Sequence, residues 1–423
     1  MSDDAELLIA GGGLNGLVLG IACAGAGLAV ALVDRGNPAA MLDQGFDGRG
    51  SAIAYGSQQV LSALGLWPLI AAEAEPILEI RVADDSAPLF LHYDHRELGA
   101  DAPLGWIVEN RVLRRALLEH ARSLPTLAFL APLEVGGVDT SPFAAETALS
   151  DGRRLTVRLV AAADGAGSPL RRAAGIRTVE WRYPQTAIVT TVRHERPHAG
   201  IAVEHFLPAG PFAILPMTDD PAHQGCAARQ AQASLAPKGR SSIVWTERTE
   251  LAASLIALPD PAFTAELAAR FGDFLGTIEP IGPRWTYPLQ LMLAERYVDQ
   301  RLALIGEAAH VIHPIAGQGL NLGIRDVAAL AEIIIDARRL GLDIGDDVLL
   351  RRYQQWRRLD ALLLAAVTDG LNRLFSNSIA PLRLVRDLGL AAVDRLPPLK
   401  RFLMRDAMGI TGDLPRLVRG LPL

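Results

Sequence analysis

The chain is poor in cysteine and has no excess of basic residues. Its 423 residues include only two cysteines, Cys23 and Cys226, and they form no spacing typical of a metal site. This argues against a disulfide framework and favours a reducing compartment. The formal net charge is −6. Because phosphate binding needs a concentrated basic face, we expect no nucleic-acid partner.

A basic leader is also missing, although residues 7–33 carry no charge and are long enough to span a membrane. The chain begins with Met-Ser-Asp-Asp-Ala-Glu, which is acidic and unlike a signal peptide. Glycines interrupt the uncharged run at positions 11, 12, 13, 16, 20, 25 and 27. The run divides more naturally into strand, glycine turn, helix and strand, so we do not expect it to cross a membrane.

The length predicts more than one structural unit. A chain of 423 residues of which 50% are hydrophobic exceeds one ordinary core, so two or three subdomains are expected. Neither an internal repeat nor a low-complexity segment is apparent.

A glycine turn follows the first predicted strand, residues 6–10. Gly11, Gly13 and Gly16 form G-x-G-x-x-G before a helix to about residue 26, and a second strand ends at Asp34. In such a motif the first glycine makes the turn, the second lets a pyrophosphate approach, and the third allows close packing. An acid at the end of the second strand can bind ribose hydroxyls. The motif predicts dinucleotide binding but does not separate NAD from FAD.

Two later strands end in similar junctions. Residues 159–163 lead into Asp164-Gly165, before a short helix expected to begin at Pro169. Residues 302–305 lead into Gly306-Glu307, then a turn rich in glycine and proline, and a helix from about Leu320. A strand, a polar turn and a helix N-terminus present backbone N–H groups to an electron-rich ligand. The alternative is a tight turn of the kind found in any α/β protein.

Two arginines are candidates for cofactor contacts. Arg49 could neutralise a phosphate, or it could be a solvated loop residue. Arg111 opens a predicted helix, for which Asn110 suits the N-cap, and it could equally be a surface residue.

The middle of the chain changes character. Residues 186–194, 201–208, 211–217 and 241–247 alternate with period two and predict an antiparallel sheet. The charged residues 76–103 are expected to be irregular. From about residue 346 the pattern is helical, and residues 371–423 carry nine Lys or Arg against four Asp. This basic, apolar tail could meet a membrane surface or a partner, or simply pack as a helix with solvated arginines.

In order and spacing, the three junctions resemble those of the p-hydroxybenzoate hydroxylase-like aromatic-ring hydroxylases, which have a single FAD-binding domain. The resemblance covers nearly the whole chain. Local segments are most similar to the ubiquinone-biosynthesis hydroxylases of this class. These segments are residues 109–111, 206–211 with Leu215-Pro216, 242–246, 313–321, 370–375 and 411–416.

The resemblance implies an α/β fold: a Rossmann-like FAD-binding domain, an inserted, mostly antiparallel β-sheet substrate domain and a C-terminal helical region. The FAD-binding domain would comprise residues 1–75, 106–180 and 291–345. An excursion of the substrate domain would take up 76–105, the sheet domain 181–290 and the helical region 346–423.

The resemblance also assigns roles to the junctions. The glycine turn would hold the FAD pyrophosphate and Asp34 the adenosine ribose. Asp164 and Gly165 would support FAD and take part in NAD(P)H use. Gly306 and Glu307 would hold the ribityl chain, although the family usually has Asp where this chain has Glu307. The residues expected beside the isoalloxazine are Pro314, Gly317, Gln318, Gly319, Leu320 and Asn321.

The implied activity is hydroxylation of a polyprenylated phenol in ubiquinone biosynthesis. Reduced FAD would react with O2 to give a C4a-hydroperoxide that transfers OH to the ring, with Pro314 shaping the pocket over C4a. Electrons would come from NAD(P)H or a small redox protein, and no metal is needed. His205, Tyr183 and Tyr287 are candidates for activating the phenol, although each could be structural.

The implied location is cytoplasmic, at a membrane surface, with other ubiquinone-biosynthesis proteins as partners. Two alternatives remain: a hydroxylase or epoxidase of the same fold acting on another aromatic or alkene substrate, or a non-catalytic flavin-binding scaffold. A halogenase is disfavoured because the chain lacks Trp-x-Trp-x-Ile-Pro.

Overall fold

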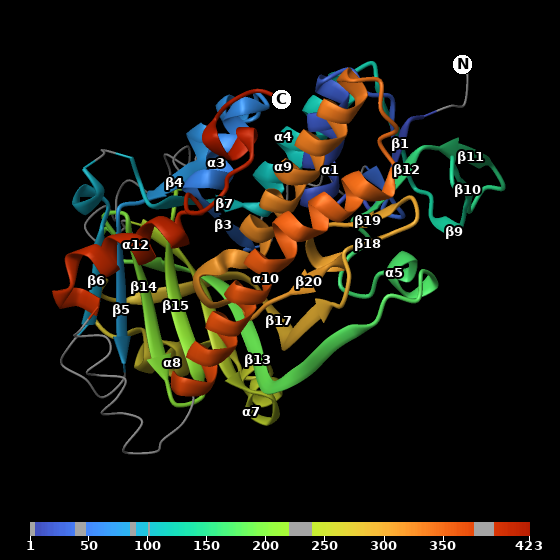
Figure 1. Cartoon of the computed structure of the whole chain (residues 1–423). Coiled ribbons are helices and arrows are strands. Elements are labelled where there is room, and N and C mark those ends of the chain that lie inside the picture. The colour runs from blue at the N-terminus through green and yellow to red at the C-terminus, as the bar shows by residue number, and fades with distance from the viewer. Residues whose placement is uncertain (1–4, 39–47, 85–89, 100–101, 220–238, 376–392) are drawn as a thin grey trace.

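A computed structural model of the chain shows two sheet-containing halves crossed by long C-terminal helices (Figure 1). It describes residues 5–38, 48–84, 90–99, 102–219, 239–375 and 393–423. Cys226 and the tail segment 376–392 lie outside the described residues.

The first half is built on a six-stranded sheet with the order β18-β19-β12-β1-β2-β8. Five strands are parallel and β18 is antiparallel. The bounds are β1 (Leu7–Ala10), β2 (Val30–Val33), β8 (Leu127–Leu130), β12 (Leu159–Ala162), β18 (Val298–Asp299) and β19 (Leu302–Leu304). Since β1, β12 and β19 are adjacent and parallel, the three predicted junctions meet at one edge of the sheet.

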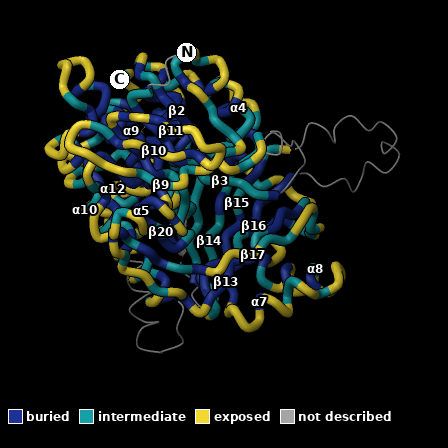
Figure 2. Tube along the Cα trace, turned by 90° about the vertical axis from the view of Figure 1, so that its right-hand side faces the viewer, coloured by how far each residue is buried: buried dark blue, intermediate teal, exposed yellow. Residues whose placement is uncertain are grey.

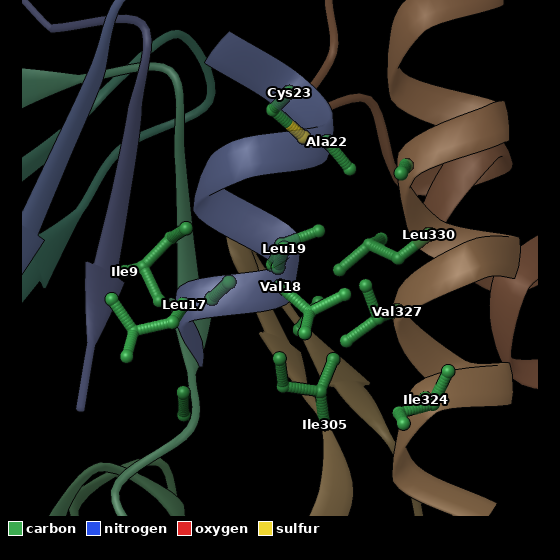
Figure 3. Close-up of a cluster of buried hydrophobic side chains, with 14 of the residues drawn as sticks. Ile9, Leu17, Val18, Leu19, Ala22, Cys23, Ile305, Ile324, Val327 and Leu330 are labelled. Atoms are coloured by element: carbon green, nitrogen blue, oxygen red, sulfur yellow. The ribbon is translucent and has the colours of Figure 1, made fainter. Parts of the chain in front are cut away.

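Helices α1 (Leu14–Gly25) and α9 (Gln318–Arg339) pack together beside this sheet. Figure 3 shows Val18 and Ala22 of α1 directed towards Val327 and Leu330 of α9. Cys23 lies fully buried in the same core, where burial raises the pKa of its thiol to about 12. It therefore acts as a small apolar side chain that fills space in the core.

Helix α4 (Asn110–Ser123) is the predicted helix, but Asn110 is not its N-cap. The cap position is Glu109, and the Asn110 side chain instead accepts a hydrogen bond from Ser51 Oγ at 2.6 Å. The cap prediction was wrong because a cross-strand hydroxyl is available to this amide, which local sequence does not reveal.

The second half is an eight-stranded sheet with the order β20-β17-β13-β16-β15-β14-β5-β6. All neighbouring pairs are antiparallel except β14 and β5. The bounds are β5 (Glu79–Asp84), β6 (Phe90–Asp94), β13 (Thr178–His194), β14 (Ile201–Leu207), β15 (Gly210–Met217), β16 (Gly239–Arg248), β17 (Ile278–Ala294) and β20 (His310–Val311). The expectation of irregular structure in 76–103 was thus wrong, because β5 pairs with β14, more than a hundred residues away, and β6 pairs in turn with β5.

The two faces of this sheet have different neighbours. The face carrying Ile188, Phe212 and Trp245 packs on α7 (Thr249–Ile256) and α8 (Asp260–Phe271), and we call it the outer face. The opposite, inner face is turned towards the first half. There Thr191 Oγ1 donates to the carbonyl of Gly48 at 3.1 Å. Figure 1 shows α7 and α8 on the side of the sheet away from the parallel strands.

Two small sheets complete the first half. One joins β3 (Gly50–Ala54), β7 (Gly105–Glu109) and β4 (Ala74–Ile77), and β3 runs into α3 (Tyr55–Ala63). The other joins β9 (Val135–Thr140), β10 (Ala145–Leu149) and β11 (Arg154–Val157). The short helix α5 (Pro169–Ala173) begins at Pro169 as predicted, with the Ser168 side chain as its cap.

The tail connects the two halves. Helix α10 (Asp347–Phe375) starts beside the parallel sheet, where Tyr353 donates to the carbonyl of Leu304 at 2.7 Å. It ends at the inner face of the large sheet, where Asn372 Nδ2 donates to Gln185 Oε1 at 3.0 Å. Helix α12 (Pro397–Ala407) follows. Within the described part of the chain, every helix is too short or too polar to cross a membrane.

Replacement of Gly16 should test the packing of the glycine turn. A Cβ at Gly16 would lie 1.9 Å from the carbonyl oxygen of Gly11. We expect Gly16→Ala to lower the free energy of unfolding of the FAD-free protein by about 3 kcal/mol, measured by chemical denaturation followed by circular dichroism.

Gly25→Ala is the matched control at the other end of the same helix, where a Cβ meets no atom within 4 Å. Alanine favours a helix over glycine, so this variant should be unchanged or stabilised by up to about 1 kcal/mol. Equal effects of the two substitutions would contradict the packing argument.

Candidate active site

A different structural feature explains the presence of glycine at each of the three positions of the turn. Gly11 has φ +110°, and a Cβ there would lie 2.3 Å from the carbonyl oxygen of Ala163. Gly16 is required by its contact with Gly11. Gly13, by contrast, faces open space at the N-terminus of α1, with no atom within 4 Å of a Cβ position. A group can therefore approach the helix N-terminus at Gly13, where unpaired N–H groups favour an anion.

Asp34 stands at the end of β2 and holds the glycine turn. Its Oδ2 accepts a hydrogen bond from Gly12 N and its Oδ1 one from Gly36 N, both at 2.6 Å. Each carboxylate oxygen has a second lone pair, and the side chain is only partly buried. A ribose contact by Asp34 stays a prediction with suitable geometry.

Asp164 stands at the end of the adjacent strand β12. Its Oδ2 accepts from Leu170 N at 3.2 Å, whereas its buried Oδ1 has no hydrogen-bond partner among the described residues. Burial raises the pKa of this carboxyl, partly offset by its hydrogen bonds. Gly165 has φ +84° and leaves open space beside it. A buried acceptor without a partner next to open space fits a ligand hydroxyl.

The third junction is packed against the first. Gly306 has φ +57°, and Cβ atoms at Gly306 and Gly323 would lie 2.4 and 2.3 Å from Asn15 Nδ2. The Asn15 side chain, one residue before Gly16, thus fills the space that two distant glycines leave. Glu307 lies exposed at the same edge.

The loop that follows leads to the N-terminus of α9. The Pro314 carbonyl accepts from Gly317 N at 2.9 Å. Gly317 has φ +62°, and a Cβ there would lie 2.8 Å from Ala52 Cβ. Gly319 is exposed, with open space around its Cβ position, and Leu320 is partly buried. The backbone at Gly319 is thus accessible to a flat ring.

Two side chains at this helix start are already engaged. Asn321 accepts from Ala54 N at 2.8 Å and donates to the carbonyl of Ala52 at 2.9 Å, which attaches α9 to β3. Gln318 Nε2 donates to the carbonyl of Ala407 at 3.2 Å. Their side chains therefore bind neighbouring backbone groups. Contact of these residues with the cofactor stays a prediction, and we expect their main-chain atoms to make it.

The two arginine candidates lie at the boundary between the halves. The Arg49 guanidinium stacks 4.7 Å from the ring centroid of Trp285 on the large sheet. Arg111 Nε donates to Glu109 Oε2 at 2.7 Å, and the other oxygen of Glu109 accepts from the buried Arg240 at 2.9 Å. Neither is a simple solvated surface arginine, and phosphate contact stays a prediction for both.

This edge fits FAD. Open space lies at Gly13, Gly165 and Gly319, on three junctions that parallel strands bring together. The orphaned Asp164 oxygen adds an acceptor for a hydroxyl.

Comparison with known proteins agrees with FAD binding. Residues 4–365 match the family model described as FAD binding domain. Ubiquinone hydroxylase UbiL of Rhodospirillum rubrum is 51% identical over 422 residues, covering 99% of this chain and 94% of the relative. The chain belongs to the FAD-dependent hydroxylases of ubiquinone biosynthesis. The 3-demethoxyubiquinol 3-hydroxylase of Escherichia coli is 33% identical, covering 96% of this chain and 98% of that protein.

Solved structures of FAD-dependent monooxygenases share the fold of this hydroxylase. The p-nitrophenol 4-monooxygenase PnpA of Pseudomonas putida has a TM-score of 0.76 at 20% identity, covering 97% of this chain and 98% of that one. PqsL of Pseudomonas aeruginosa has a TM-score of 0.73 at 22% identity, covering 92% of this chain and 100% of that one. The chain is therefore an FAD-dependent aromatic-ring monooxygenase. When bound, FAD supplies the oxygen-activating chemistry, and we predict that the residues of the three junctions would bind and orient it.

The three predicted substrate-activating residues differ in their position relative to the flavin edge. His205 pairs with Phe212 across β14 and β15 and so lies on the outer face, away from the flavin edge. This location argues against His205 as a substrate-activating residue, because strand register, which sequence left open, sets its face. Tyr287 lies on the inner face in register with Ala187 and is 40% exposed, which leaves it a candidate. Tyr183 donates its hydroxyl to Asp369 Oδ1 at 2.8 Å, and burial and this bond raise its pKa.

A residue that the sequence did not single out lies next to Pro314. His313 is fully buried, and neither ring nitrogen has a hydrogen-bond partner among the described residues. Burial lowers the pKa of His313 to about 4, so the ring is neutral at physiological pH. It meets the Tyr183 ring edge to face at 5.2 Å. The only sequence signal was its place before Pro314.

A buried network of charged side chains binds the backbone of the flavin edge at Gly306. Asp326 of α9 accepts from Gly306 N at 3.1 Å, from His310 Nε2 at 2.6 Å and from Arg357 Nε of α10 at 2.9 Å. Burial alone would raise the pKa of Asp326, but His310 and Arg357 outweigh it and lower the pKa below its usual value.

Gly13→Val should separate folding from FAD binding. The added side chain enters open space, so the stability of the FAD-free protein should stay nearly unchanged. A pyrophosphate could no longer approach, and FAD affinity should fall by about 100-fold, or about 2.7 kcal/mol, measured by flavin fluorescence titration.

Gly137→Val on β9 is the control, because it also meets no atom within 4 Å but lies outside the three junctions. FAD binding at wild-type strength by Gly13→Val would refute the assignment of the glycine turn.

Asp326→Asn should lower the free energy of unfolding by about 3 kcal/mol near neutral pH, since it removes one of the two counter-charges of the buried Arg357 and leaves only Asp360, at 2.7 Å. The folded-state pKa of Asp326 is lowered, so its contribution is present above the ordinary carboxyl pKa and is lost as pH falls through the folded value. The stability gap between wild type and variant in chemical denaturation should therefore narrow at acidic pH. A gap that is constant or widens with acidification would contradict this.

Proposed function

We propose that this hydroxylase adds a hydroxyl group to the aromatic ring of a polyprenylated phenol, a ubiquinone precursor, using O2. The observation that carries the proposal is the match along nearly the whole chain to UbiL, at 51% identity. The name of that relative states its pathway, and the apolar surroundings of the flavin edge support a lipid-like substrate.

Two apolar clusters border the region between the inner face and the flavin edge. One joins Phe206 of β14, Phe375 of α10 and Ile315, the residue after Pro314. The other joins Ala202 of β14 to Met404 and Met408 near α12. A prenyl chain needs a continuous apolar path, and these clusters supply apolar walls towards both ends of the inner face of β14.

The test uses the FAD-loaded protein with a short-chain prenylphenol, NADH or NADPH, and ¹⁸O2. A product heavier by one ¹⁸O atom, identified by mass spectrometry, is expected. Accumulation of a quinone precursor after deletion of the gene would identify the missing hydroxyl and hence the ring position. Turnover of soluble phenols or alkenes only would favour the alternative substrate class, and no oxygenation of any substrate would favour the scaffold.

We further propose NAD(P)H as the reductant, on the strength of the Asp164-Gly165 junction. Anaerobic mixing with NADH or NADPH should bleach the flavin absorbance within the turnover time. Bleaching that requires an added small redox protein would overturn this proposal.

We also propose that the protein docks on anionic membrane surfaces through α10 and α12. On α10, Leu359, Leu363 and Val367 form one stripe at four-residue spacing and are 63%, 59% and 56% exposed. On α12, Phe402 is 56% exposed beside the exposed Arg401. Both helices lie on the same side of the molecule in Figures 1 and 2. An apolar stripe flanked by cations suits an anionic lipid surface.

Replacement of Leu359, Leu363 and Val367 together by serine should weaken binding to vesicles of mixed neutral and anionic lipid by at least about tenfold, measured by flotation. Phe143→Ser, at an 83% exposed position between β9 and β10, is the control and should bind as wild type. Wild-type protein that stays off such vesicles would overturn the docking proposal without affecting the proposed reaction.

A further inference from the structure

An acidic side chain that has no role in the description above lies on the inner face of β14. Glu204 alternates with His205, so its side chain points to the face opposite that of His205. Its cross-strand neighbours are Ala213 of β15 and Val82 of β5, both apolar. Among the described residues, no hydrogen bond or ion pair engages the Glu204 carboxylate.

Its position relative to the flavin edge follows from the residues two places away along the strand. Phe206 packs with Ile315, which follows Pro314. Ala202 belongs to the cluster that includes Ala52, the residue against which Gly317 packs. Glu204 therefore lies between Phe206, which packs on the loop expected beside the isoalloxazine, and Ala202, whose cluster includes the neighbour of that loop, Ala52.

The inner face of β14 is not evenly covered around Glu204. β14 lies inside the sheet, between β15 and β5, and Ala202 and Phe206 of its inner face are buried, whereas Glu204 between them is only partly buried. The neighbouring β15 is almost entirely buried. A strand in the interior of a sheet keeps accessible surface only where open space adjoins it.

Burial without a counter-charge raises the pKa of Glu204 to about 7. An unpaired carboxyl in apolar surroundings is costly, so a group retained there generally meets a partner that arrives later. A phenol hydroxyl is such a partner, because it is a donor on an otherwise apolar ring.

We propose that Glu204 accepts the hydrogen bond of the substrate's phenolic hydroxyl and so fixes the ring beneath the flavin edge. A carboxylate acceptor draws the phenolic proton towards itself and increases electron density at the ring carbons that are hydroxylated. This inference rests on the proposed function, since it presumes a phenol as substrate.

The experiment compares two ligands of the FAD-loaded protein, 2-geranylphenol and geranylbenzene, which lacks the hydroxyl. Dissociation constants come from quenching of tryptophan fluorescence. The wild type should prefer the phenol by about 10- to 100-fold, the range of a hydrogen bond to a charged group. Glu204→Leu should bind both ligands equally, and Glu204→Gln should keep a preference of only a few-fold.

Glu279→Gln is the matched control: the same change of charge at an exposed position of β17 in the same sheet. It should keep the wild-type preference. FAD content and melting temperature verify that each variant is folded. Glu204→Leu should melt at or above the wild-type temperature, because it removes an unpaired acid from apolar surroundings.

Retention of the full preference for phenol by Glu204→Leu would overturn the assignment of Glu204. So would a wild-type protein that binds both ligands equally. Failure of the proposed function is a separate result: the wild type would prefer the phenol, yet yield no hydroxylated product from it.

Discussion

One buried carboxylate, Asp326, connects the parts on which the active site depends. It accepts hydrogen bonds from the backbone after β19, from His310 beside β20 and from Arg357 of α10. These partners belong to the flavin edge, the large sheet and the tail. Because a buried ion pair tolerates little change in geometry, the three parts are fixed relative to one another at this point. The pocket between sheet and flavin edge takes its shape from that constraint.

Where a structural signal is local, the sequence predicted it. The strand, glycine turn, helix and strand of residues 7–33 follow from spacing alone, because a Cβ at Gly11 or Gly16 would meet nearby backbone and Gly13 leaves the start of α1 open. The Asp164 and Gly306 junctions were found in the same way, at the ends of short apolar strands. The family resemblance added the identity of the cofactor, which spacing had left open.

Where the signal depends on distant partners, the sequence failed. The segment of β5 and β6 looked irregular because β14, the strand that joins β5 to the large sheet, is far along the chain. His205 was proposed as a substrate-activating residue and the adjacent Glu204 was not considered, since only strand register decides which of them faces the flavin edge. The place of Asn321 beside the ring stays a prediction, but the sequence did not reveal that its amide binds the backbone of β3, a pairing across 267 residues.

The contacts of residues 407 and 408 carry a consequence for the timing of assembly. The carbonyl of Ala407 accepts from Gln318 at the start of α9, and that of Met408 accepts from Gly56 N in α3. Arg416 then pairs with Asp336 further along α9. A ribosome makes these residues after every strand of both large sheets. The nascent chain can therefore form its nucleotide fold early, while the end of the pocket beside the ring is completed only once this late segment has emerged and docked.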